Sequence, residues 1–261
     1  MENRALWSQD CTVRFEAVDR SDRLRLSAAF GLFQEAATSH AESIGVGRDD
    51  MARAGRGWVL SRMSVQVDRR PLYLEKITVR SWPRKWEKLF AVRDFDILDG
   101  DGKTAVRGRS CWLVIDTEKR RPLRPQSLMD PLPLNEGKDA LPAALGLEEC
   151  PSLQKIAERQ ALYSDLDYNG HVNNVSYIRW IQDILDPALL EQARRMRLDI
   201  NYLNEVLPGE VTDIWSAEIA ANAGADTAPN ADAAAAFAFE GKKDQPPDNP
   251  SAFRAELRLW R

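Results

Sequence analysis

The sequence has few of the residues that build metal centres or disulfide frameworks. Its 261 residues include only 3 cysteines and 2 histidines. Cys11, Cys111 and Cys150 are odd in number and lie far apart, so they are a poor disulfide framework and favour a reducing compartment. Because no cysteine pair has CxxC spacing and His40 lies far from His171, we expect neither a metal site nor a cofactor.

Long apolar runs and a strong charge imbalance are also missing. No apolar run approaches the roughly 18 residues that a membrane span requires, and the first residues lack the apolar core of a signal peptide. The 36 basic and 40 acidic residues leave a net charge of −4, which argues against nucleic acid as a general partner. We therefore expect a cytoplasmic globular protein with no membrane span.

The chain contains one arrangement of helix and strand patterns twice. In the first half, apolar residues at helical spacing run from Leu26 to Ile44, where Gly45 ends the pattern. In the second half, a similar apolar stripe covers residues 175–185. Strand patterns surround these helices at 11–17, 58–67, 74–82, 89–98, 105–115, 196–202, 211–220, 233–239 and 252–260. The pattern predicts two units, each with a long helix wrapped by an antiparallel sheet.

The two predicted units are related by a faint internal repeat. An offset of 135 residues pairs Val65 with Ile200 and Glu75 with Glu210, and Ser21-Asp22 resembles Ser164-Asp165. Between the halves, six prolines in residues 122–152 predict an extended linker with a helical turn near Leu141–Leu147. The predicted domains are 1–125, a linker at 126–152, and 153–261. Two polar stretches, 220–236 and 241–250, are typical of hairpin insertions at a sheet edge.

The segment from Tyr163 to Asn174 carries the clearest chemical signal. If it is extended, its period of two directs the side chains of Asp167, Asn169 and His171 to the same side. Asn173 or Asn174 can cap the following helix, whose first-turn N–H groups would then favour an oxyanion. These groups suit the transfer of an acyl group to water. The alternative is that they cap the helix and only satisfy one another.

The run Asp-x-Asn-x-His-Val-Asn-Asn-x-x-Tyr at 167–177 resembles the acyl-acyl carrier protein thioesterases of plants and bacteria. The first half resembles the same family at 32–40, 58–69 and 110–116, so the likeness covers nearly the whole chain. This resemblance implies an α+β fold, the tandem (double) hotdog. It also implies release of free fatty acid from acyl carrier protein, with the acyl chain bound by the first hotdog and catalysis in the second.

The resemblance also implies which residues act. The family's downstream acidic residue falls on Glu205, and plant members have a cysteine directly after it, where this chain has Val206. A thiolate nucleophile is therefore excluded there, and a water activated by a carboxylate and a histidine is favoured. Asp167 as a nucleophile that forms an acyl anhydride stays open. The expected catalytic residues are Asp167, Asn169, His171 and Glu205, and the expected oxyanion amides are those of Val172, Asn173 and Asn174.

Residues of the first half and several basic clusters are weaker candidates. Phe30, Phe33, Trp58 and Trp112 are expected to pack the first core and are candidates for an acyl tunnel. His40, a lone histidine on an apolar face, is more typical of a core residue. The clusters at 69–70, 119–121 and 194–197 are candidates for steering an acidic acyl carrier protein, with the last favoured.

Three other functions compete with this prediction. An acyl-coenzyme A thioesterase would use the same residues. A non-catalytic acyl-thioester-binding hotdog protein would not need Asp167, His171 and Glu205 together. A hotdog dehydratase is disfavoured, because His40 with Glu35 is a poor substitute for its acid–histidine pair. A homodimer is left open.

Overall fold

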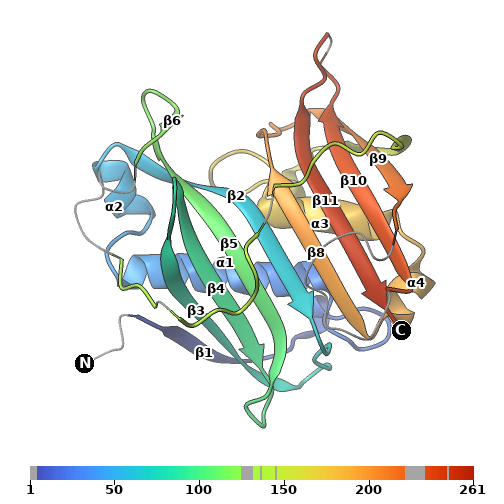
Figure 1. Cartoon of the computed structure of the whole chain (residues 1–261), viewed down its shortest axis with the longest axis horizontal. Helices are drawn as coiled ribbons and strands as arrows, with labels where there is room; N and C mark the ends of the chain where they lie inside the picture. The colour runs from blue at the N-terminus through green and yellow to red at the C-terminus, as the bar shows by residue number, and fades with distance from the viewer. Residues whose placement is uncertain (1–4, 125–131, 136, 145, 221–232, 246) are drawn as a thin grey trace. The chain divides into compact units, whose positions relative to one another are not determined.

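In each half of the chain a long helix lies against an antiparallel sheet (Figure 1). The computed structural model describes residues 5–124, 132–135, 137–144, 146–220, 233–245 and 247–261. The chain divides into two compact units, Met1–Ala144 and Leu145–Arg261, called unit 1 and unit 2 below. Within the described residues, no helix is both long and apolar enough to cross a membrane.

Unit 1 is built around α1 (Leu26–Ser43), which is followed by the short α2 (Arg48–Arg53). Its strands are β1 (Trp7–Thr12), β2 (Arg56–Val67), β3 (Lys76–Glu87), β4 (Phe90–Leu98), β5 (Thr104–Asp116) and the two-residue β6 (Arg121–Pro122). They are ordered β1-β3-β4-β5-β2 in the sheet, all antiparallel, with β6 paired to β5. The predicted helix and the four strands after it are therefore confirmed.

Unit 2 repeats this plan around α3 (Asn174–Asp183), followed by α4 (Pro187–Gln192). Its strands are β7 (Gln154–Gln160), β8 (Arg195–Tyr202), β9 (Val211–Glu218), β10 (Ala235–Lys243) and β11 (Ser251–Trp260), in the order β8-β11-β10-β9-β7. β10 runs past the predicted 233–239, into the stretch expected to be a hairpin insertion. Most of the other predicted insertion, 221–232, lies outside the described residues.

The predicted strand at 11–17 is wrong in its position. β1 ends at Thr12, and Phe15–Ala17 forms a 3₁₀ turn. The Val13 N–H still donates to Glu75 O, at 2.9 Å, which continues the register of β1 with β3 by one residue before the chain turns away. Phe15, whose alternation with Val13 suggested a strand, is 80% exposed.

The core of unit 1 lies between α1 and the sheet. Phe30, Phe33 and Ala37 of α1 are buried, and the Phe33 ring stacks on Phe95 of β4 with 4.9 Å between ring centroids. Gly108 of β5 lets Phe33 approach the strand, because a Cβ there would stand 2.6 Å from the ring. The apolar stripe of the sequence thus determines which face of α1 meets the sheet.

The two units also share a pattern of backbone hydrogen bonds. In unit 1 the Asp19 N–H donates to Arg23 O and the Leu24 N–H to Pro71 O; in unit 2 Asp167 and Val172 donate to His171 O and Val206 O. All four distances lie between 2.8 and 3.0 Å. Glu75 and Glu210 likewise accept from Leu72 N–H and Leu207 N–H at 2.8 Å, which agrees with the offset of 135.

One part of the predicted repeat was misaligned. The hydrogen bonds match Ser21 with Asn169, because Ser21 N–H and Asn169 N–H donate to the carboxylates of Asp19 and Asp167. Ser164 therefore matches Glu16 in the preceding 3₁₀ turn rather than Ser21. The identical Ser-Asp pairs at 21–22 and 164–165 therefore suggested an alignment of the two turns that is wrong by several residues.

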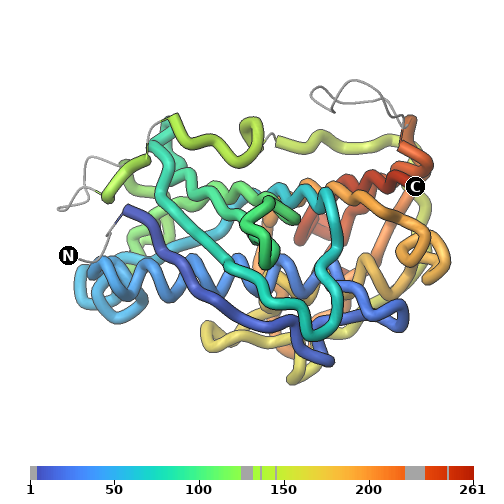
Figure 2. Tube along the Cα trace, turned by 90° about the horizontal axis from the view of Figure 1, so that it is seen from below, coloured from blue at the N-terminus to red at the C-terminus, as the bar shows by residue number. Residues whose placement is uncertain are grey.

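The proline-rich segment covers one face of the sheet of unit 1. Residues 132–135 and 137–144, here called the strap, lie on the face opposite to α1, as Figure 2 shows. Asn135 N–H donates to Pro83 O, Trp82 Nε1 donates to Lys138 O, and Ala140 N–H donates to Asp94 Oδ2. The helical turn expected near Leu141–Leu147 does not form in the described residues. The strap is instead extended by its contacts with the strands.

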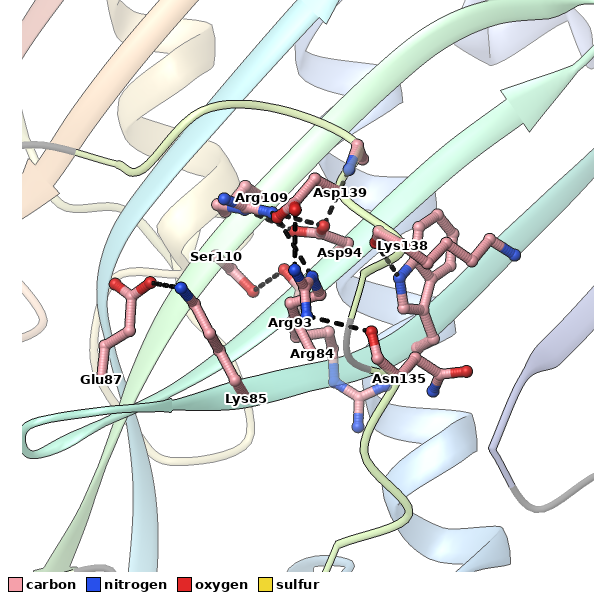
Figure 3. A network of polar contacts seen from close by, with 12 residues as sticks. Arg84, Lys85, Glu87, Arg93, Asp94, Arg109, Ser110, Asn135, Lys138 and Asp139 are labelled. Carbon is pink, nitrogen blue, oxygen red and sulfur yellow. Dashed lines mark hydrogen bonds and ion pairs between the residues drawn. The ribbon is translucent and has the colours of Figure 1, made fainter.

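Two arginines of the sheet hold the strap by a single carboxylate (Figure 3). Asp139 accepts from Arg84 Nη2 at 2.7 Å and from Arg109 Nη2 at 2.5 Å, while Arg109 also pairs with the buried Asp94. The hydrogen bonds from Arg84 and Arg109 lower the pKa of Asp139 to about 2. The charged form of Asp139 therefore stabilises the folded strap.

We expect Asp139→Asn to lower the melting temperature at pH 7, by an amount equivalent to about 1 kcal/mol or less, since the carboxylate is half exposed. The stabilisation is present above the unfolded pKa near 3.8 and is lost as the pH falls towards 2. The difference between variant and wild type should therefore vanish near pH 2 in melts followed by circular dichroism. Asp101→Asn, in the exposed β4–β5 turn, serves as the control; a pH-independent difference for D139N would contradict the assignment.

Candidate active site

The segment before α3 folds as a tight turn rather than an extended strand. Asp167 N–H donates to His171 O at 3.0 Å, and Gly170 N–H donates to Asp167 O at 3.1 Å. Gly170 has φ +82°, a backbone conformation that glycine adopts readily. The expected alternation of side chains is therefore wrong, because residues 168–170 bend the chain back on itself. The turn nevertheless brings Asp167 and His171 together.

The Asp167 carboxylate organises this turn. Its Oδ1 accepts from Asn169 N–H at 2.8 Å and its Oδ2 from Asn169 Nδ2 at 3.2 Å. His171 Nδ1 lies 3.8 Å from Asp167 Oδ1, within ion-pair range but longer than a hydrogen bond. The Asp167 side chain is 12% exposed and that of His171 28%. The carboxylate is thus enclosed, while the imidazole can reach a substrate.

Glu205 lies in the loop between β8 and β9, which runs beside the turn. Val172 N–H donates to Val206 O at 2.9 Å, so the residue after His171 is bonded to the residue after Glu205. Lys243 Nζ donates to the backbone oxygen of Glu205 at 3.0 Å and so fixes the loop from the other side. The two segments predicted to share a site are therefore joined directly by their backbones.

Lys243 also pairs with Glu210 at the end of the same loop, at 2.9 Å. Burial alone would raise the pKa of Glu210. The Leu207 N–H and the Lys243 ammonium outweigh it, and the pKa is lowered. Glu210 is therefore a charged anchor of the loop, engaged by groups of the protein itself.

Tyr177 of α3 links the helix to the loop that carries Glu205. Its side chain is 3% exposed, and its phenol oxygen accepts a hydrogen bond from the Val206 N–H. Burial raises the pKa of the phenol, and the charges of Glu210, Asp167 and Glu205 raise it further. From the sequence, Tyr177 was only the last residue of the motif at 167–177, and no role was predicted for it.

The first turn of α3 uses most of its amides within the protein. Asn173 caps the helix, because its Oδ1 accepts from Val175 N–H at 2.8 Å, as the sequence predicted. Among the amides expected to bind an oxyanion, Val172 N–H donates to Val206 O and Asn173 N–H to Asp165 O. Within the described residues, Asn174 N–H has no acceptor. Of the three, Asn174 alone keeps its amide available for a substrate oxygen.

The other expected site residues lie in unit 1. Phe30 and Phe33 are fully buried in its core. Trp58 and Trp112 are partly buried; their Nε1 atoms donate to Val46 O and Ser110 Oγ, respectively. His40 is buried, with its Nδ1 2.9 Å from Arg93 Nη1, as expected of a core histidine with a partner.

Two of the three basic clusters, 69–70 and 194–197, are partly neutralised within the fold. Arg69 pairs with Glu75 and Asp99, and Arg70 pairs with Asp19. In the favoured cluster, Arg197 pairs with Asp199 at 2.9 Å and Arg195 lies over the Trp260 ring. These clusters therefore offer less free positive charge than the sequence suggested.

Two helix-and-sheet units of this kind, with a polar turn at the start of the second helix, define a double-hotdog protein. The sequence matches the acyl-ACP thioesterase N-terminal domain at residues 5–129 and the acyl-ACP thioesterase C-terminal domain at residues 151–237. The chain therefore belongs to the acyl-ACP thioesterase family, and the predicted family and fold class are confirmed.

Individual relatives agree with this assignment. The chain is 26% identical over 222 residues to an acyl-[acyl-carrier-protein] hydrolase of Cuphea viscosissima, covering 78% of this chain and 53% of the relative. It is 26% identical over 225 residues to a palmitoyl-acyl carrier protein thioesterase of Arabidopsis thaliana, with the same coverages. Both names include "chloroplastic". The chain thus spans about half the length of the curated relatives it matches.

Solved structures match over the whole length of the chain. An acyl-ACP thioesterase from Bacteroides thetaiotaomicron superposes with a TM-score of 0.83 at 25% identity and covers 99% of this chain and 98% of its own. A 12:0-ACP thioesterase from Umbellularia californica superposes with a TM-score of 0.73 at 21% identity, covering 98% and 97%. The second likeness shows the fold alone.

We expect Tyr177→Phe to lower kcat roughly five- to tenfold, because the Val206 N–H loses an acceptor worth about 1 kcal/mol and the Glu205 loop is less well fixed. The ring packing stays, so KM and the melting temperature should change little. Steady-state kinetics with an acyl thioester and a thermal melt separate these effects. Tyr163→Phe, at a 93% exposed tyrosine, is the control; an unchanged kcat in Y177F would contradict the role.

Proposed function

We propose that this protein hydrolyses fatty acyl thioesters of acyl carrier protein and releases the free fatty acid. The observation that carries the proposal is the backbone bond from Val172 to Val206, which holds the Asp167–His171 turn against the Glu205 loop. Membership of the acyl-ACP thioesterase family supports the reaction class. The names of the relatives, which include acyl-ACP hydrolases and thioesterases, support acyl carrier protein as the carrier.

In the proposed mechanism Glu205 is the general base. Its carboxylate takes a proton from water, and the resulting hydroxide adds to the thioester carbonyl carbon. The carbonyl oxygen becomes an oxyanion, which the Asn174 N–H stabilises at the start of α3. When the tetrahedral intermediate collapses, the carbon–sulfur bond breaks and the thiolate accepts the proton from Glu205. His171 orients the Glu205 carboxylate, and Asp167 with Asn169 holds the turn that positions the imidazole.

The internal repeat supports this role for Glu205. In unit 1 the matching position is Arg70, which directly precedes Pro71 as Glu205 precedes Val206. The Arg70 guanidinium reaches the Asp19 carboxylate and also donates to Leu24 O at 3.0 Å. By analogy, we infer that the Glu205 side chain is directed towards the turn. Because a second carboxylate would repel it from Asp167, we infer that it acts there on His171 or a water.

The alternative with Asp167 as the nucleophile is less well supported. Both of its oxygens accept hydrogen bonds from Asn169, and its side chain is only 12% exposed. A nucleophile must come into direct contact with the carbonyl carbon, and these hydrogen bonds and the low exposure restrict that approach. The geometry therefore favours Asp167 as a positioning residue.

We expect Glu205→Gln and Asp167→Asn each to reduce kcat by roughly a hundredfold or more, because the first removes the carboxylate that activates water and the second removes the carboxylate that positions the His171 imidazole. The fold should be retained, since both replacements are isosteric. Release of free thiol from acyl carrier protein thioesters of six to eighteen carbons measures the effect. Glu158→Gln, a surface carboxylate on β7, is the matched control. Turnover near wild type in both site variants would refute the mechanism.

The carrier remains to be distinguished from coenzyme A, which an enzyme with the same site would accept. The ratio of kcat/KM for one acyl chain on the two carriers decides between them, and we expect acyl carrier protein to be preferred. A non-catalytic hotdog protein would release no thiol from either carrier. The cytoplasmic location and the homodimer stay predictions, and the names of the plant relatives point to a different compartment for those proteins.

A further inference from the structure

Three large apolar residues in succession are exposed in the loop between β2 and β3 of unit 1 (Figure 1). Leu72, Tyr73 and Leu74 are 50%, 40% and 59% exposed. Phe15 of the 3₁₀ turn, 80% exposed, adds a fourth apolar side chain, since its ring lies edge-on to Tyr73 with 6.2 Å between ring centroids. These four residues are called the apolar patch below. Exposed apolar residues that adjoin one another mark an interaction surface.

Leu74 has a backbone conformation that leucine rarely adopts. Its φ is +64°, in the left-handed region, where the Cβ crowds the backbone. The matching residue of unit 2 is Gly209, with φ +81°, and glycine adopts this conformation freely. The two loops are bonded alike: Leu74 N–H donates to Val13 O at 3.0 Å. Gly209 N–H donates to Ala161 O at 2.9 Å. Unit 2 thus shows that the fold needs no side chain here, and the leucine of unit 1 is strained without being buried.

Basic residues predominate around the apolar patch. Residues 14–25 and 71–76 include six exposed charged residues, of which four are basic and two are acidic. The basic ones are Arg14, Arg20, Arg25 and Lys76, and the acidic ones are Glu16 and Asp22. The matching stretches of unit 2, 162–173 and 206–211, contain Asp165, Asp167 and Glu210 but no lysine or arginine. The partner of the apolar patch is therefore expected to combine negative charge with apolar groups.

The size and charge of the apolar patch distinguish between three kinds of partner. A symmetric contact with a second copy would bring the surrounding basic residues together, which opposes it. A stable complex with another protein buries roughly 800 Å² on each side between closely matched shapes, and four side chains on two turns offer little for such a fit. An anionic bilayer requires no matched shape. Leucine and phenylalanine enter the boundary of the acyl chains, tyrosine lies among the headgroups, and arginine and lysine meet the phosphates.

We propose that the apolar patch binds unit 1 to the surface of an anionic phospholipid bilayer. Its side chains insert at the boundary between headgroups and acyl chains, and the basic residues around it attract the lipid phosphates. The association is peripheral and reversible, because four side chains bury far less apolar surface than a membrane-spanning helix. It does not rest on the proposed function, since none of these residues belongs to the candidate active site.

Co-sedimentation of the full chain with lipid vesicles tests the proposal. Vesicles of equal parts phosphatidylglycerol and phosphatidylcholine are compared with vesicles of phosphatidylcholine alone. We expect wild type to bind the anionic vesicles at least about tenfold more tightly, because the attraction of the basic residues adds to apolar insertion. High salt should reduce this preference. No binding of wild type to the anionic vesicles, or equal binding to both kinds, would overturn the proposal.

Leu74→Gly separates binding from stability. Glycine relieves the strained backbone, so the melting temperature should not fall, while vesicle binding should fall about fivefold because an inserting side chain is lost. Leu89→Ser, at a 39% exposed leucine in the turn between β3 and β4, is the matched control and should bind like wild type. If L74G did not fold, Phe15→Ser would take its place. Binding unchanged in the patch variant, or reduced equally in L89S, counts against the proposal.

Measurements without lipid identify the other two kinds of partner. In protein that does not bind vesicles, a dimer seen by sedimentation velocity and dissociated by L74G would assign the apolar patch to a second copy. Binding of acyl carrier protein that L74G weakens would, under the same condition, assign it to an acidic protein. Either result overturns the lipid proposal. Absence of thioester hydrolysis, with vesicle binding intact, would refute the proposed function and leave the lipid-binding surface standing.

Discussion

The hydrogen bond from Val172 N–H to Val206 O is the interaction on which the arrangement of the site depends. It joins a turn that carries an aspartate and a histidine to a loop that carries a glutamate, although these residues are separated by more than thirty positions of sequence. Tyr177 supports the same residue from inside, since the Val206 N–H donates to its phenol oxygen. Val206 is thus held through both its N–H and its C=O, as a pre-organised site requires.

The same bond exists in unit 1, between Leu24 and Pro71, and there it supports no comparable set of side chains. Arg70 stands where unit 2 has Glu205, and Arg23 where it has His171. The turn of unit 1 is closed by the ion pair of Asp19 with Arg70. The backbone framework therefore determines where side chains meet, and the side chains alone determine whether they neutralise one another or remain available for a substrate.

Much of the fold could be predicted because its long elements have clear periodicity. The stripe on α1 and the alternation in β2 to β5 depend on burial against one partner face, which sequence patterns record. The failures have local causes. β7 is a polar edge strand with little alternation, so no strand was predicted there. The segment at 167–171 was predicted to be extended, because its turn depends on a hydrogen bond from Asn169 N–H to the Asp167 carboxylate and such a bond has no periodic pattern in the sequence. The pairing of Asp167 with the Glu205 loop came from the family resemblance, since a contact across so many residues leaves no local signal.

The strap has a consequence for how unit 1 must fold. Its carboxylate Asp139 lies across strands that must already be paired before Arg84 and Arg109 stand side by side to receive it. We therefore expect the strap to dock after β3, β4 and β5 have paired, as a late step in the folding of unit 1. The strap follows these strands in the sequence, so during synthesis the strands leave the ribosome first and one face of their sheet is uncovered until the strap emerges. The order of synthesis therefore matches the order in which the segments can pack.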